Sequence, residues 1–106
     1  MRDTKALEKV LAEDTTLSLL DKGFIVTVLG NEVNPYIPER EVLRSINAIV
    51  RLYMRGYNTY SESLDSIKST VTVYCSEWVA ENINVESVFD WFKSMYFITS
   101  VLLDER

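Results

Sequence analysis

The sequence predicts an all-α protein, a small bundle of four or five helices that forms a single domain over residues 1–106. Three observations favour this class. Apolar residues recur every three or four positions along most of the chain, which is the spacing of one face of a helix. Only three glycines and two prolines are present, so few turns can depend on glycine and no low-complexity linker divides the chain. A hydrophobic fraction of 47% over 106 residues suits one compact domain.

The first predicted helix begins after Asp3 or Thr4, because either side chain can accept hydrogen bonds from the backbone N–H groups of the first turn. It ends near Glu13. Lys5 and Lys9 lie on one side of this helix, and the apolar residues lie on the other: Leu7, Val10 and Leu11.

The segment 15–30 is interpreted as a second helix, with a short strand over residues 24–29 as the alternative. Thr15 can cap the helix and Gly30 can end it. Gly23 interrupts the pattern, and the segment 24–29 is β-branched enough for a strand. The helix is favoured because the following segment carries two prolines and makes a poor central strand. Its helical row consists of Leu17, Leu20, Phe24 and Val28.

The third predicted helix has the clearest pattern. Pro38 suits the first helical position, Glu39 and Glu41 favour the positive end of the helix dipole, and Gly56 stands where a left-handed residue ends a helix. One face is committed to the core, and it carries Val42, Ile46, Ile49, Val50 and Tyr53.

The fourth predicted helix begins at Ser61, which can cap it. The segment 70–75 alternates in the manner of a strand, but a longer helical row outweighs it. That row consists of Leu64, Ile67, Val71, Tyr74, Cys75 and Trp78. Because Cys75 shares a face with Val71 and Trp78, its thiol is expected to be buried and unreactive.

The last predicted helix runs from Val85 to Leu103, and Asn82 or Asn84 divides it from the preceding helix. Phe97 and Val101 fall outside its main apolar face, where a monomer would expose them to water. They therefore predict a surface for self-association or for a partner protein.

A row of arginines marks the opposite side of the third helix. Their spacings of four, seven and four place them within an arc of about 60°. We call this row the arginine ridge: Arg40, Arg44, Asn47, Arg51 and Arg55. It is either a solvated face or a docking surface for an acidic partner or a phosphate backbone. Tyr57 and Tyr60 follow it and could stack on a base or anchor a protein contact.

The residues needed for common enzyme chemistry are missing from the sequence. It contains no histidine, which removes the commonest general base and most zinc sites. The three glycines are isolated, so no phosphate-binding loop is present. Pairs of carboxylates such as Glu62 with Asp65 are typical of a solvated surface. We expect a protein that is not an enzyme and that uses no cofactor and no metal.

The segment 49–74 resembles, in part, the helix-turn-helix of transposases and recombinases. Leu52-Tyr53, Gly56-Tyr57 and Ser69-Thr70-Val71 are similar to that motif, although the interval between them is about two residues short. The resemblance implies a recognition helix that starts near Ser69. That helix would carry Glu77 and Glu81, whereas a helix that reads a DNA groove should not be acidic.

The formal net charge of −5 disfavours non-specific binding to nucleic acid. A single cysteine excludes an internal disulfide, the charged first residues do not form a signal peptide, and no apolar run is long enough to span a membrane. We expect a cytoplasmic, non-enzymatic regulatory or inhibitory protein that binds another protein, similar in size and charge to phage, immunity and antitoxin proteins. A helix-turn-helix nucleic-acid binder and a structural homo-oligomer are the alternatives.

Overall fold

Seven helices make up the part of the chain described by the computed structural model, residues 5–30 and 38–103. No strand occurs in these ranges. The all-α class is therefore confirmed, the expected count of four or five helices is too low, and the alternative strand at 24–29 is wrong. The helices are α1 (Lys5–Glu13), α2 (Leu19–Gly30), α3 (Pro38–Met54), α4 (Tyr60–Tyr74), α5 (Glu77–Asn82), α6 (Val85–Ser94) and α7 (Tyr96–Leu102).

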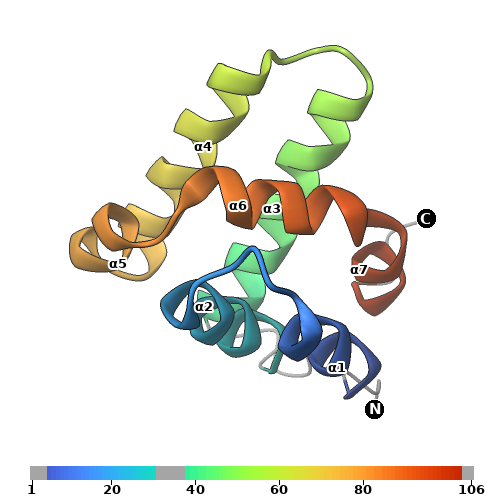
Figure 1. Ribbon diagram of the computed structural model, residues 1–106. Helices are drawn as coiled ribbons and strands as arrows, with labels where there is room; N and C mark the ends of the chain where they lie inside the picture. The colour runs from blue at the N-terminus through green and yellow to red at the C-terminus, as the bar shows by residue number, and fades with distance from the viewer. Residues whose placement is uncertain (1–4, 31–37, 104–106) are drawn as a thin grey trace.

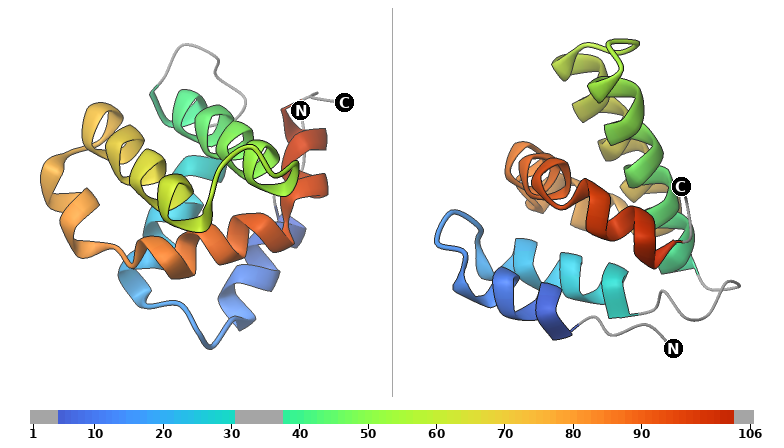
Figure 2. Two further views of the ribbon diagram at one scale, coloured as in Figure 1. Left: turned by 90° about the horizontal axis from the view of Figure 1, so that it is seen from above. Right: turned by 90° about the vertical axis from the view of Figure 1, so that its right-hand side faces the viewer.

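The helix α6 crosses the α3–α4 pair, and the α1–α2 pair lies on its other side (Figure 1). Figure 2 shows the same arrangement from above and from the side. At the end of α6 the chain bends, and α7 packs against α3. No helix in the described ranges is both long and apolar enough to cross a membrane. The largest fully buried side chains come from five helices: Leu11, Ile25, Val28, Leu29, Val42, Leu43, Ile46, Val50, Ile67, Phe89 and Phe92.

The link between α3 and α4 is set by local hydrogen bonds. Gly56 has a φ of 80° and ends α3 as predicted, because glycine adopts this left-handed backbone conformation without a steric penalty. Thr59, not Ser61, caps α4: the Glu62 N–H donates to Thr59 Oγ1 at 3.1 Å, and the Thr59 N–H donates to Glu62 Oε1 at 2.9 Å. Hydrogen bonds to the Glu62 carboxylate from the Thr59 backbone N–H and from the Thr59 side chain lower the pKa of Glu62.

The predicted apolar row of α4 breaks at its C-terminus. The helix is continuous through Tyr74, as expected for the segment 70–75, but Cys75 leaves helical geometry with φ −111° and ψ −87°. Ser76 then caps α5, a helix that the sequence did not reveal. Cys75 is exposed and Trp78 is 61% exposed, so the expectation of a buried Cys75 is wrong. The change of direction after Tyr74 turns both side chains away from the core.

The predicted last helix is two helices. Asn84, one of the two residues expected to separate this helix from the preceding one, caps α6. The helix α6 ends at Ser94, however, and α7 begins at Tyr96. Met95 lies between them with φ −102° and ψ 11°. The bend turns α7 out of the line of α6 (Figure 1), and α7 packs against α3.

Candidate functional site

Asn47 lies inside the molecule, although the sequence placed it on the arginine ridge. Its side chain is 2% exposed. Asn47 Nδ2 donates to Ser100 Oγ at 3.2 Å, and Thr99 Oγ1 donates to Asn47 Oδ1 at 2.7 Å. Thr99 and Ser100 are themselves buried. This residue therefore fixes α7 against α3 and does not face a partner.

The helix α7 also covers part of the ridge beside Asn47. Arg51 is half-buried, and its Nε donates to the hydroxyl of Tyr96 at 3.2 Å. Arg44 and Arg55 are exposed. Arg44 lies one helical turn before Asn47, and Arg55 lies one turn after Arg51. The side chain of Arg40 lies outside the described residues. The arginines thus flank the line along which α7 packs, and they do not form one continuous exposed row.

The outer side of α7 is apolar and exposed. Phe97 is 74% exposed, Ile98 50% and Val101 57%, and we call these three residues the α7 surface. Their spacing places them on one face of the helix. The ring of Phe97 packs edge-on against Tyr96, with the ring centroids 5.5 Å apart. Sequence reasoning identified Phe97 and Val101 and placed Ile98 at the border, so the structure extends that pair to three residues.

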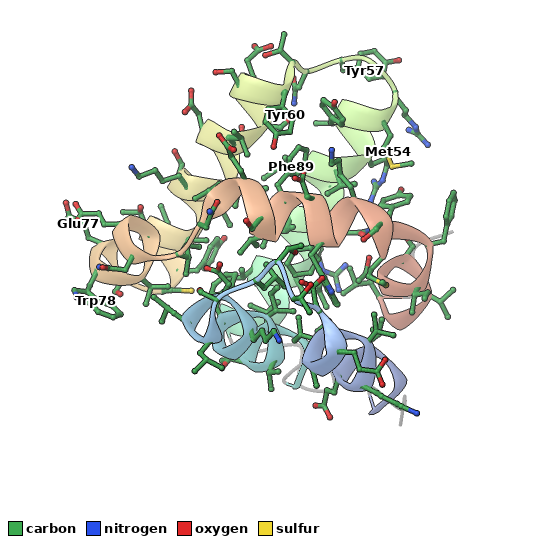
Figure 3. All side chains as sticks on the ribbon, in the orientation of Figure 1. Met54, Tyr57, Tyr60, Glu77, Trp78 and Phe89 are labelled. Carbon is green, nitrogen blue, oxygen red and sulfur yellow. The ribbon has the colours of Figure 1, made fainter. Side chains whose placement is uncertain are left out.

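Tyr57 and Tyr60 are not brought together. Tyr57 is 73% exposed at the outside of the α3–α4 link, near Met54, whereas Tyr60 points toward Phe89 (Figure 3). The Tyr60 hydroxyl donates to Asp90 Oδ1 at 3.4 Å. Tyr57 is therefore exposed to solvent, and Tyr60 contacts residues of the same chain.

Tyr60 belongs to a cluster of three rings that surrounds a lysine. The ring centroids of Tyr53, Tyr60 and Phe89 lie 5.3–6.1 Å from one another. Lys93 Nζ lies 5.2–5.3 Å from all three centroids and 3.2 Å from Asp90 Oδ1. Such contacts attract a cation to the ring faces. Sequence reasoning missed this cluster, although the spacing of Phe89 and Lys93 by four residues is a signal that they share a helix face.

The pKa of Tyr60 offers a direct test of this cluster. Burial raises the pKa of its phenol above the ordinary value of about 10, and the charges of Asp90 and Glu86 raise it further. Because the folded-state pKa is the higher one, neutral Tyr60 stabilises the fold fully below pH ~10, and this contribution is lost as the pH rises further. Tyr60→Phe should remove the last step of tyrosinate absorbance near 295 nm in an alkaline titration. Tyr57→Phe should retain that step, and the reverse result would contradict the cluster.

The described residues offer no arrangement for metal chemistry, since no three cysteine, aspartate or glutamate side chains in them converge on one point. The helix-turn-helix resemblance implies a new helix that starts near Ser69, but α4 continues unbroken from Tyr60 to Tyr74. No helix therefore starts near Ser69, where the resemblance places the recognition helix.

No protein-family model, curated protein or solved structure matches the chain. The exposed side chains of α7 and the arginines beside them are therefore the basis for proposing a function.

Proposed function

We propose that the protein is a non-enzymatic regulatory or inhibitory protein of the cytoplasm, which acts by binding another protein through the α7 surface. The observation that supports this most is the exposure of Phe97, Ile98 and Val101, each at half of its area or more. Adjacent exposed apolar side chains are unfavourable in water, and a partner that covers them gains the free energy of their burial.

The support beneath α7 favours tight binding. Asn47 holds the inner side of the helix through Thr99 and Ser100, so the outer side is already ordered before a partner arrives. A preordered surface loses less conformational entropy on binding than a flexible one. Arg44 and Arg55 are exposed on α3, the helix against which α7 packs, and arginine is enriched in protein interfaces. We therefore expect a partner surface that is mainly apolar and also carries acidic groups.

The double variant Phe97→Ser with Val101→Ser tests the proposal. Both side chains are largely exposed, so the free energy of unfolding should change by less than about 1 kcal/mol in total. Loss of one interface hot spot typically removes ~2 kcal/mol, so affinity for the partner should fall by about 30-fold or more. The partner is captured from a lysate of the native host on the wild-type protein and identified, and its affinity is then measured for each variant.

A matched control replaces Leu19 and Val73 with serine. These side chains are 88% and 76% exposed, and they lie on α2 and α4, away from α7. This control should bind like the wild type. Equal affinity of the wild type and the α7 double variant would contradict the proposal. Unfolding of the α7 double variant would also contradict it, because the two residues would then belong to the core.

The captured partner can be a second copy of the chain, which is the homo-oligomer alternative. Sedimentation velocity over a range of concentrations distinguishes the two outcomes. A wild type that associates with itself, and a double variant that stays monomeric, would establish self-association through the C-terminal helix. A wild type that stays monomeric but retains its partner establishes binding of a different protein.

A further inference from the structure

A groove of about 410 Å³ lies between α2 and the end of α4, and no residue of α7 lines it. Its volume falls within the range of ~300–1,000 Å³ that is usual for small-molecule sites. The α2 side of the groove is apolar, because this helix carries apolar residues almost all round. The lining comes mainly from Leu20, Gly23, Phe24 and Thr27 on one side and from Tyr74 and Cys75 on the other.

The lining of the groove selects for a neutral ligand. No charged side chain takes part in it. A charged group that entered would lose its hydration without gaining an opposite charge, which is unfavourable. The hydroxyl of Thr27 donates to the Gly23 carbonyl at 2.9 Å, so this lining hydroxyl is turned toward its own helix. The surfaces that remain to contact a ligand are mostly carbon, with the rings of Phe24 and Tyr74 among them.

Gly23 leaves open space at the wall of the groove. Glycine inside a helix destabilises it relative to alanine. Its backbone is not in the left-handed region, and a Cβ added to it would meet nothing within 4 Å. Neither backbone conformation nor packing therefore requires glycine at this position. What the missing side chain provides is open space, and that space belongs to the groove.

We propose that this groove binds a small, neutral, mainly apolar molecule, which lies against the bare backbone of Gly23 and the rings of Phe24 and Tyr74. The site is separate from the α7 surface, and it holds whether or not the protein acts through that surface. Cys75 at its wall is exposed, so its thiol reports whether the groove is occupied.

The test uses N-phenyl-1-naphthylamine, a neutral apolar dye that fluoresces when it leaves water. The wild type should bind it saturably with one molecule per chain. Gly23→Leu, whose side chain extends from the α2 wall into the groove, should weaken binding at least tenfold, and Gly23→Ala should weaken it less. The anionic relative 1-anilinonaphthalene-8-sulfonate should bind the wild type at least tenfold more weakly. Gly23→Ala should retain the wild-type circular dichroism spectrum, since a Cβ at this position meets no atom within 4 Å. The spectrum of Gly23→Leu should also match, because its side chain enters open space in the groove.

A second measurement locates the dye without any variant. Saturating dye should slow the alkylation of Cys75 by N-ethylmaleimide several-fold. The variant with Phe97→Ser and Val101→Ser should bind the dye like the wild type, so failure of this proposal is distinguishable from failure of the α7 proposal. Absence of saturable binding, unchanged affinity in Gly23→Leu, or an unchanged rate of alkylation would each overturn the assignment. A lysate protein that binds Gly23→Leu less well while the dye does not bind at all would assign the groove to a protein partner instead.

Discussion

Replacing Phe89 with alanine is expected to lower the free energy of unfolding by about 3–5 kcal/mol, as is typical for a buried phenylalanine. Phe89 is fully buried on α6, where that helix crosses α3 and α4. Its ring lies 5.3 Å from Tyr53 and 5.5 Å from Tyr60, and Lys93 Nζ lies over its face. The substitution therefore leaves a cavity and also removes one of the rings that hold the lysine. Urea unfolding followed by circular dichroism at 222 nm measures the change.

Phe97→Ala is the matched control for this experiment. The same side chain is removed from the same C-terminal segment, but Phe97 is 74% exposed. Its loss should change the free energy of unfolding by no more than about 0.5 kcal/mol. Similar losses for Phe89→Ala and Phe97→Ala would contradict the position of α6 between the helix pairs.

Replacing Asp21 with alanine should lower the free energy of unfolding by about 2–4 kcal/mol, because two backbone donors then lose a charged acceptor. Asp21 is 1% exposed. Its Oδ1 accepts from the Asn84 N–H at 2.8 Å, and its Oδ2 accepts from the Ser18 N–H at 3.4 Å. The Asp21 N–H in turn donates to Ser18 Oγ at 3.1 Å, which completes a reciprocal cap at the start of α2. Thermal or urea unfolding measures the loss.

The position of Asp21 explains how a carboxylate can be buried here. It lies at the start of α2 and contacts Asn84, the residue that caps α6. Both helix ends present partial positive charge, which favours an anion between them. Asp14→Ala is the control, since Asp14 also accepts from nearby N–H groups, of Thr16 and Leu17, but in a loop that is not buried. Its loss should lower stability by only about 1 kcal/mol. An Asp14→Ala loss as large as that of Asp21→Ala would contradict this account.

Local signals were sufficient for much of the fold. The core face of α3 follows from its spacing, and Val42, Ile46 and Val50 are fully buried as predicted. Gly56 ends this helix because its conformation is a local property of the backbone. The breaks after Tyr74 and at Met95 were missed for a different reason. Apolar residues continue at helical spacing across both positions, and this periodicity does not show where a helix changes direction.

The candidate site was predicted less completely because its contacts join distant parts of the chain. The charge pattern of α3 placed Asn47 and Arg51 in water. The structure places Thr99 and Ser100 against Asn47 and Tyr96 against Arg51, and these contacts bridge 45–53 residues. The residues of α3 alone contain no sign of them. The exposure of Phe97 and Val101 was visible from the sequence, since it follows from the helix face on which each residue falls.

The contacts between Lys93 and its three rings should respond to ionic strength differently from the exposed arginines. Dissolved salt screens charges in water over about 8 Å at physiological concentration, so the proposed attraction of exposed arginines to an acidic partner should weaken as salt is added. The ammonium of Lys93 lies 5.2–5.3 Å from three ring centroids, a short-range attraction across which few ions can intervene. Added salt should therefore weaken the proposed encounter with a partner, while the contacts of Lys93 continue to hold α6 against α3 and α4.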